Sequence, residues 1–317
     1  MNNKCKTIEI GKGLNILTRF DVLSYDLDSF PKESIIVNID PSVVKIASNA
    51  FRAIESIVEV YVPDSVEEIG KTAFAYCKNL ERVKLSNKIK KIDDYMFYNS
   101  TNLTKIDIPD SVKLIGKHAF GNCFELENLI IPDLVTDIEL GAFENCRSIK
   151  DINLNDNIID IESRTFYGCK SLNNIKGINN TQIIGSETFA FCESISSISL
   201  PSVRDINNNA FCNCKTLKNV EIPNIELIDD FAFYNCESLD NIQLPSSLRY
   251  VGYNVFTNCP NLNYVNLSNS SFDDSVEKIF ENSNNINKID ISLESAKSIL
   301  AHCFGIEDSD IINIKNE

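Results

Sequence analysis

A phenylalanine recurs at almost constant spacing through most of this chain of 317 residues. The steps between successive members are 23 residues six times, then 22, 22, 23 and 24 residues. The series comprises Phe51, Phe74, Phe97, Phe120, Phe143, Phe166, Phe189, Phe211, Phe233, Phe256 and Phe280. Such a period is the signature of a repeat architecture, in which each copy buries its apolar residues only by stacking on its neighbours. It therefore predicts a solenoid rather than an ordinary globular fold.

The other apolar positions follow the same period. Each unit reads L-x-x-[VI]-x-[LI]-P, then a turn, then I-[GDE]-x-x-[AT]-F-x-x-C. The apolar–x–apolar segment alternates with a period of two, which predicts a short strand, and proline can end such a strand without breaking the ladder. Stacked copies would each contribute one strand to a parallel sheet.

This unit resembles the BspA-like class of leucine-rich repeats. The copy from Leu103 to Cys123 reads LTKIDIPDSVKLIGKHAFGNC, and the resemblance extends from about Val37 to Ile291. It implies an α/β-type repeat solenoid, a right-handed leucine-rich-repeat arc. Its concave face would carry a parallel β-sheet of short strands, with many turns and little regular helix.

Several copies depart from the consensus. Ser100 and Ser283 stand where the other copies have cysteine, Ile54 replaces it in the first copy, and Gly177-Ile178 replaces the Leu-Pro pair at the end of a strand. The two 22-residue units predict a small irregularity in curvature near Phe189 to Phe233.

The two ends of the chain lack the complete unit and are interpreted as caps. Residues 1–34 form the expected N-terminal cap, residues 35–291 form the solenoid of about eleven repeats, and residues 292–317 form the expected C-terminal cap. Within this last segment, residues 292–304 have the apolar spacing of one helix face, and residues 310–314 read as a final strand. Caps would cover the sheet edges that an open solenoid exposes.

The eleven cysteines invite a disulfide or a metal interpretation, but their positions favour buried free thiols. Eight of them follow a repeat phenylalanine by three residues and form an interior column of small apolar side chains: Cys77, Cys123, Cys146, Cys169, Cys192, Cys214, Cys236 and Cys259. Cys212 lies outside this column and is expected nearer the surface. A C-x-x-C pair is absent from the sequence, so a disulfide framework and a metal site remain weaker alternatives.

Composition limits the possible chemistry. His118 and His302 are the only histidines, and we find no nucleophile elbow, metalloprotease, P-loop or dinucleotide-binding motif. The sequence therefore indicates no enzyme, no cofactor and no metal. The net charge of −15 argues against nucleic acid as a partner.

The sequence as written shows no secretory signal and no apolar run of about 20 residues that could span a membrane. Together with the free thiols, this predicts a cytoplasmic protein without membrane insertion. A chain from which a signal had been removed would look the same and would belong at the cell surface or be secreted. A monomer is the default expectation.

Only positions that do not build the fold are free to bind a partner. On each strand these lie eight and ten residues after the phenylalanine, and they should point outward from the concave sheet. The predicted partner-binding residues are Tyr61, Arg82, Lys84, Lys105, Asp107, Asn128, Ile130, Asp151, Asn153, Asn174, Lys176, Asn219, Glu221, Asn241, Gln243 and Tyr264. Further outward positions are Glu59, Ser197, Ser199, Asn266, Lys288 and Asp290. These positions together hold five acids and five bases, so the face is neutral and rich in amides and hydroxyls.

Charge is unevenly distributed along the chain. Residues 78–91 carry a net charge of +5 and residues 133–162 a net charge of −6. One interpretation is two solvated faces that attract each other weakly, and the other is a polarised surface that orients a partner.

The leading hypothesis is a non-catalytic protein–protein binding scaffold that uses the concave face, as an intracellular adaptor or inhibitor. The alternative is a cell-surface or secreted adhesin-like protein that binds host or extracellular proteins, as the resemblance also implies. The sequence does not identify the partner.

Overall fold

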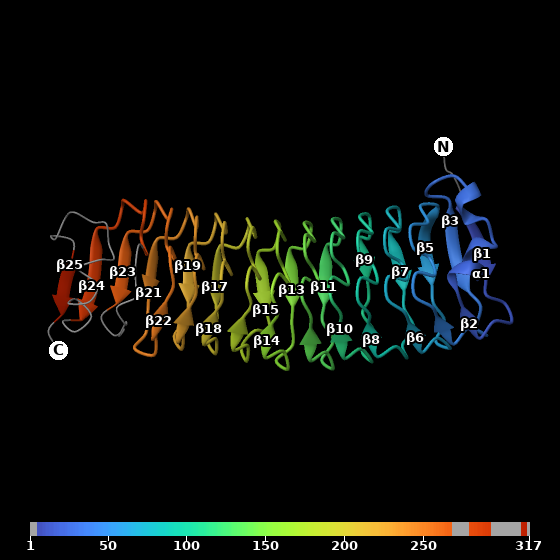
Figure 1. Cartoon of the computed structure of the whole chain (residues 1–317), viewed down its shortest axis with the longest axis horizontal. Helices are drawn as coiled ribbons and strands as arrows, with labels where there is room; N and C mark the ends of the chain where they lie inside the picture. Colours follow the sequence, from blue (N-terminus) through green and yellow to red (C-terminus); the bar gives the residue numbers. More distant parts are fainter. Residues whose placement is uncertain (1–4, 268–278, 293–311, 316–317) are drawn as a thin grey trace. The chain divides into compact units, whose positions relative to one another are not determined.

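The computed structural model describes residues 5–267, 279–292 and 312–315. The chain divides into two compact units, residues 1–158 and residues 159–317. Each unit is built from parallel β-strands stacked as the turns of a β-solenoid, with about eleven turns in the chain and very little helix (Figure 1). The sequence prediction of a leucine-rich-repeat solenoid is confirmed.

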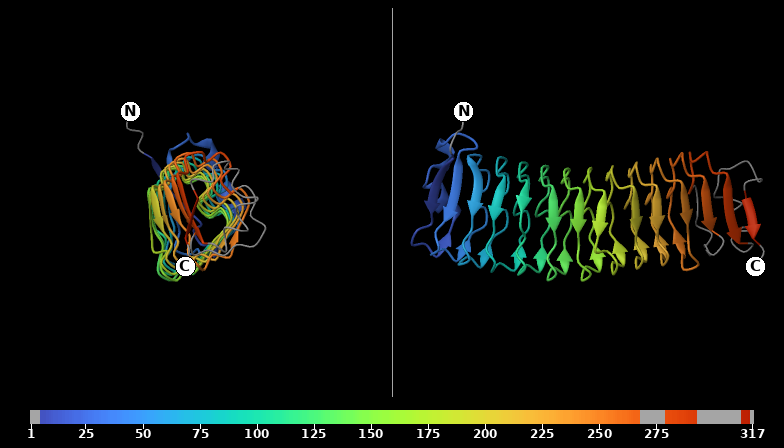
Figure 2. Two further views of the ribbon diagram at one scale, coloured as in Figure 1. Left: turned by 90° about the vertical axis from the view of Figure 1, so that its left-hand side faces the viewer. Right: turned by 180° about the vertical axis from the view of Figure 1, so that it is seen from behind.

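In the first unit, each turn of the solenoid contributes one strand to a long-strand row and one to a short-strand row. The long-strand row contains β1 (Lys6–Ile10), β3 (Ile35–Ile39), β5 (Ile57–Tyr61), β7 (Arg82–Lys84), β9 (Lys105–Ile106), β11 (Asn128–Ile130) and β13 (Asp151–Asn153). The short-strand row contains β2 (Ile16–Leu17), β4 (Lys45–Ile46), β6 (Glu68–Ile69), β8 (Lys91–Ile92), β10 (Leu114–Ile115) and β12 (Asp137–Ile138). Neighbouring strands pair in parallel, in the order β1-β3-β5-β7-β9 and β8-β10-β12 (Figure 2).

The second unit repeats this arrangement. Its long-strand row contains β15 (Asn174–Lys176), β17 (Ser197–Ser199), β19 (Asn219–Glu221), β21 (Asn241–Gln243), β23 (Tyr264–Leu267), β24 (Lys288–Ser292) and β25 (Ile312–Lys315). Its short-strand row contains β14 (Asp160–Ile161), β16 (Ile183–Ile184), β18 (Asp205–Ile206), β20 (Leu227–Ile228) and β22 (Tyr250–Val251). The short strands form one continuous sheet, whereas the long strands divide between β17-β19 and β21-β23-β24-β25.

The short-strand row is an element that the sequence analysis missed. Its apolar positions, such as Ile69 and Ile115, are the isoleucines that follow the turn in the repeat motif, and no strand was predicted for them. In the structure, each pairs in register with the same position of a neighbouring turn, as Ile115 does with Ile92. A strand of two residues is too short to show an alternating pattern in the sequence. The short strands form only because the stacked copies pair with one another.

A stack of phenylalanine rings fills the core of each unit. The repeat phenylalanines up to Phe256 are fully buried, and the ring of Phe280 is 3% exposed. Successive rings within a unit lie 5.1 to 5.6 Å apart between centroids, with interplanar angles of 1° to 18°. The backbone follows the same stacking, since the N–H of Phe51 donates to the carbonyl of Ala73 and that of Phe97 to the carbonyl of Ala119, both at 2.8 Å. The residue before the phenylalanine is small in most copies, but the same bond forms where it is larger, as from Phe74 to the carbonyl of Met96 at 2.9 Å.

The turn around each phenylalanine requires a left-handed backbone on both sides of it. Positive φ angles occur two residues before the ring, as at Tyr95 and His118, and two residues after it. The later position is asparagine in seven of the described copies: Asn99, Asn122, Asn145, Asn213, Asn235, Asn258 and Asn282. Asparagine tolerates this conformation better than most residues. Its amide also bonds between turns, as Asn145 does to Asn122 at 3.0 Å.

The cysteine column makes hydrogen bonds as well as apolar contacts. The thiol of Cys77 donates to the carbonyl of Phe51 at 3.0 Å, and that of Cys123 donates to the carbonyl of Phe97 at 3.2 Å. Ser100 makes the equivalent bond to the Phe74 carbonyl at 2.8 Å. The two natural serines in this column therefore keep the donor that the buried carbonyl needs, since Ser283 does the same.

The N-terminal 34 residues contain helix α1 (Arg19–Leu23) and the 3-10 turn η1 (Leu27–Ser29). A reciprocal capping box between Thr18 and Asp21 begins α1. Although this segment lacks the repeat motif, β1 pairs with β3 over five residues. At the other end, β25 pairs in parallel with β24. The helix expected over residues 292–304 lies outside the described residues, apart from Ser292 in β24.

Candidate functional site

The predicted partner-binding residues lie on the long-strand row, and none of them is buried in the core. Nine belong to the first unit and seven to the second, and each strand alternates them with a buried residue such as Val83 or Ile242. Fourteen of the sixteen are exposed, while Asn241 and Tyr264 are half-buried. Ile130 is 74% exposed.

Much of the charge predicted to face a partner is already paired. On β5 and β7, Arg82 Nη2 lies 2.7 Å from Glu59 Oε1, and the hydroxyl of Tyr61 donates to Glu59 Oε2 at 2.8 Å. This hydrogen bond to Glu59 raises the pKa of Tyr61. Lys105 and Asp107 lie 3.8 Å apart in the next turn. This part of the face therefore presents closed polar pairs rather than separate charges.

The structure corrects one expected outward position. Asp290 on β24 is 2% exposed rather than open to solvent. Its Oδ2 accepts a 2.7 Å hydrogen bond from the Tyr264 hydroxyl, and Lys288 Nζ lies 3.3 Å from its Oδ1. Burial, together with the bond to Asp290, raises the pKa of Tyr264 to about 12. The Tyr264 hydroxyl thus serves the fold.

Two adjoining grooves hollow the long-strand row of the second unit. The first encloses about 490 Å³ over β15, β17 and β19, and the second about 670 Å³ over β17, β19 and β21. They share Ser197, Ser199, Asn219 and Glu221. The remaining polar side chains that line them are Asn173, Asn174, Lys176, Asn179, Asn241 and Gln243. We call these two grooves together the amide groove.

The amide groove lies where the long-strand ladder is interrupted. Within the described residues, β17 pairs with β19, but no strand pairing joins β15 to β17 or β19 to β21. The chain bends at Gly177, whose φ is +73° and which stands where other copies have a buried aliphatic residue such as Ile131. A similar break in strand pairing separates β9 from β11, between 23-residue units, so the irregularity in curvature expected for the 22-residue units stays a prediction.

The sequence analysis placed Ser197 and Ser199 on this face but left them out of the partner-binding set. Their small side chains, set between longer amides on β15 and β19, contribute to the hollow. Gly177-Ile178 in place of Leu-Pro was the available signal, since a glycine at a strand end often marks a bulge.

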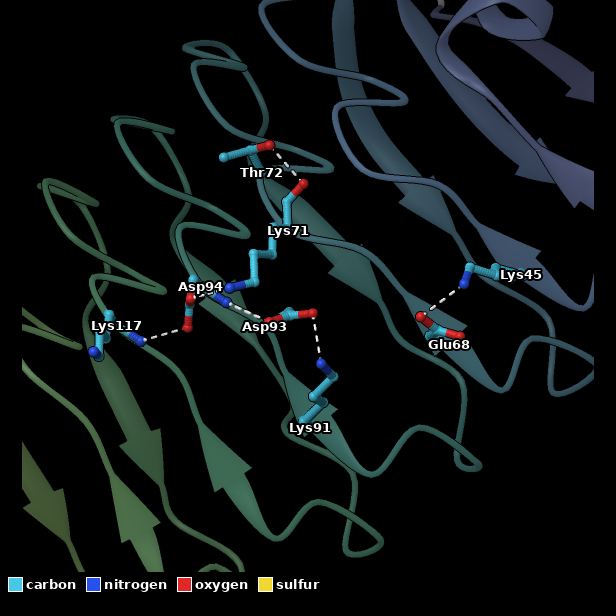
Figure 3. Close-up of polar contacts among 8 residues, drawn as sticks. All are labelled: Lys45, Glu68, Lys71, Thr72, Lys91, Asp93, Asp94 and Lys117. Atoms are coloured by element: carbon cyan, nitrogen blue, oxygen red, sulfur yellow. Dashed lines mark hydrogen bonds and ion pairs between the residues drawn. The ribbon is translucent and has the colours of Figure 1, made fainter.

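The basic segment 78–91 does not pair with the acidic segment 133–162. Its ion pairs connect to acids in the preceding turn or in its own turn: Lys78–Glu55 at 3.7 Å, Arg82–Glu59 at 2.7 Å, Lys88–Glu67 at 3.8 Å and Lys91–Asp93 at 2.8 Å. The short-strand side shows the same pattern, with Lys45–Glu68 at 2.9 Å and Lys71–Asp94 at 2.6 Å (Figure 3). Local ion pairs therefore engage much of the charge of this basic segment, and both interpretations of the two charge clusters stay predictions.

His118 is a packed residue. Its ring stacks on Tyr95 at 5.1 Å between centroids, and its Nδ1 lies 3.1 Å from Glu144 Oε2. Its buried Nδ1 makes no hydrogen bond of acceptable geometry within the described residues, so His118 is packed without being satisfied. His302 lies outside the described residues.

The ten described cysteines are all free, and the eight of the column are buried. Cys212 keeps 9% of its surface, more than any column member. Across the described ranges there is no group of three or more His, Cys, Asp and Glu side chains placed to hold a metal ion. Among the same residues, no helix is both long and apolar enough to cross a membrane.

The stacked parallel strands, the buried phenylalanine column and the exposed strand face define a leucine-rich-repeat solenoid. The family model of the BspA type leucine rich repeat region, in six copies, matches residues 29–150, 113–225 and 204–317. The chain belongs to this family.

Solved structures support the same fold. A leucine-rich repeat protein from Bacteroides ovatus is 22% identical over 89% of this chain and 92% of its own, with a TM-score of 0.51. One from Eubacterium ventriosum is 20% identical over 91% and 74%, with a TM-score of 0.53. The pneumococcal vaccine antigen PcpA is 17% identical over 99% and 90%, with a TM-score of 0.50. A search of curated proteins gives no match.

Proposed function

We propose that this chain is a non-catalytic protein-binding scaffold that engages its partner on the long-strand row, with the amide groove as the centre of contact. The observation that carries the proposal is the groove itself. It is a concave surface lined by side chains that are exposed, polar and dispensable for stacking. Membership of a family of repeat scaffolds supports the same conclusion.

The chemistry of the groove indicates what it would hold. Lys176 and Glu221 are its only lining charges among the described residues, and they have opposite signs. The other polar side chains of the lining are amides and hydroxyls, which both donate and accept hydrogen bonds, and apolar residues such as Ile198 and Val220 lie between them. Within the described residues no strand pairing joins the facing edges of β15 and β17, which leaves further backbone donors and acceptors for a partner. A polar, uncharged segment of a partner protein fits this surface better than a polyanion.

Two settings are compatible with this surface. An intracellular adaptor or inhibitor would use it to mask a partner, and an adhesin-like protein would use it to bind an extracellular one. The buried thiols do not separate these settings, because burial protects them from oxidation in either compartment. The compartment in which the partner is found separates them.

The test compares two variants that introduce the same charge on the same strand row. Asn219→Arg fills the amide groove, whereas Asn38→Arg adds an arginine to the exposed strand β3 in the other unit. Partners captured by the native protein from lysate and from extracellular fluid would be identified, and their Kd values measured with purified proteins. We expect Asn219→Arg to weaken binding by about tenfold or more, and Asn38→Arg to leave it unchanged.

Equal binding by both folded variants would exclude the amide groove as the contact. A partner held through the short-strand side instead would contradict the proposed face.

A further inference from the structure

A second pocket, outside the long-strand row, lies between helix α1 and the first repeats. It encloses about 570 Å³, and its lining includes Arg19, Asn49, Arg52, Glu55, Tyr76 and Lys78. We call it the cationic pocket. Three of these residues are basic and one is acidic, which sets the pocket apart in a protein with a net charge of −15.

Two arginines, Arg19 and Arg52, line the pocket. Arg19 Nη1 donates to the backbone carbonyl of Arg52. The Arg52 guanidinium lies over the Tyr76 ring, 5.1 Å from its centroid. Each arginine is therefore held by an uncharged group, and within the described residues neither has a carboxylate oxygen within 4.0 Å. An anion bound in the pocket would supply the opposite charge that these two arginines lack.

The one acid in the pocket is already engaged. Glu55 forms an ion pair with Lys32 outside the pocket, and Lys78 Nζ lies 3.7 Å from its Oε1. The hydrogen bond and charge of Lys32 lower the pKa of Glu55, so it stays ionised. Its charge is shared between two lysines, which leaves the arginines uncompensated.

Other arginines of the chain pair with an acid one turn away. Arg82 has its nitrogen 2.7 Å from Glu59, and Arg204 has its nitrogen 3.2 Å from Glu226. Arg52 has no acid at the equivalent spacing, because the residue one period later is Ala75. It lies over an aromatic ring instead, as Arg147 does over Phe124.

We propose that the cationic pocket binds a phosphate or sulfate group. A guanidinium presents a planar fork of donors that matches two oxygens of such an anion, and a lysine adds a point charge. The Asn49 side chain can add a neutral donor, because its Oδ1 already accepts from the Thr72 hydroxyl at 2.8 Å and its Nδ2 remains available. The ligand is either the free inorganic ion or the same group esterified to a small molecule.

The test is calorimetric titration of the full chain at constant ionic strength. The probes are inorganic phosphate, inorganic sulfate and glycerol phosphate, with chloride as the reference. We expect saturable binding of at least one probe at one site. Arg52→Gln and Lys78→Gln should each weaken that binding by about tenfold or more. Arg249→Gln removes an exposed arginine from the other unit and should leave the binding unchanged.

A tighter Kd for glycerol phosphate than for phosphate would identify an esterified group, and equal values would identify the free ion. Lys78 is exposed, so its substitution keeps the test valid if Arg52→Gln does not fold. Circular dichroism of each variant serves as the folding control. The proposal is overturned if no probe binds saturably, or if the folded pocket variants bind as Arg249→Gln does.

Discussion

The thiol of Cys123 and the hydroxyl of Ser100 make the same hydrogen bond in successive turns, each to the carbonyl of the phenylalanine in the preceding turn, 26 residues earlier. The cysteine column therefore has two requirements, a small volume and a donor. Sequence reasoning identified the first from the spacing of the column. The need for a donor has one sign in the sequence, which is that serine replaces cysteine in two copies. That sign can be interpreted only once the structure shows the buried carbonyl beside the column.

Substitution of Cys123 separates these two requirements. Cys123→Ser keeps a donor near the carbonyl of Phe97, whereas Cys123→Val keeps an apolar side chain and removes the donor. An unsatisfied buried carbonyl costs about 1 to 3 kcal/mol, so we expect Cys123→Val to lower the free energy of unfolding by that amount and Cys123→Ser to lower it less. Urea unfolding followed by circular dichroism measures both. The reverse order would show that volume alone matters.

The column thiols should also resist alkylation in the folded protein. Burial raises the pKa of Cys77 to about 12, so its reactive thiolate is scarce at pH 8 to 9 and the side chain is inaccessible. Cys5 is only half-buried. We expect iodoacetamide at pH 8 to label Cys5 in native protein and the column only in urea, as read by peptide mass spectrometry. Labelling of Cys77 without denaturant at a comparable rate would contradict this burial.

At the scale of the structural element, each turn depends on residues that fit the next turn. Gly141 occupies the position two residues before Phe143, with φ at +62°, and a Cβ there would lie 2.5 Å from two ring atoms of His118. The glycine therefore does two things at once. It adopts a left-handed conformation, and it leaves room for the imidazole that stacks on Tyr95.

A double-mutant cycle tests this coupling between turns. Gly141→Ala alone should destabilise the protein by about 2 to 4 kcal/mol, from backbone strain and the clash with His118. In a His118→Ala background, only the backbone strain of about 1 kcal/mol should remain. Thermal unfolding of the four proteins gives the interaction energy. Strict additivity of the two substitutions would show that the ring simply moves aside.

The elements also show where prediction from sequence succeeds and where it fails. The long strands and the core were predictable because their side chains alternate and repeat. The short strands were not, because a pair such as Lys91 and Ile92 has no alternation of its own. The amide groove was not predictable either, because it lies over several turns where strand pairing between neighbours is interrupted, and the sequence of a single copy does not show which neighbours pair. The cationic pocket lies between α1 and the first repeats, and the repeat period of the sequence does not predict a contact with a segment outside the repeats.

At the scale of the whole molecule, the solenoid is a chain of nearly equivalent neighbours. The N–H of Tyr95 donates to the carbonyl of Lys117, and one turn later the N–H of His118 donates to the carbonyl of Leu140. Because each turn offers the same groups to the next, one whole turn can be removed without changing what its neighbours need. The same reasoning forbids removal of part of a turn, since that shifts every buried column out of register.

Deletion of residues 98–120, one 23-residue period, joins Phe97 to Gly121 and keeps all columns aligned. Tyr95 would then meet Leu140 and Gly141 where it met Lys117 and His118. We expect this variant to unfold cooperatively, with a smaller loss of stability than the roughly 3 to 5 kcal/mol expected for Phe120→Ala. The matched control, deletion of residues 98–108, should abolish the cooperative transition. Circular dichroism during heating distinguishes the two deletions. Loss of the cooperative transition in both variants would mean that the turns are not interchangeable, and that stability depends on features found only in the deleted turn.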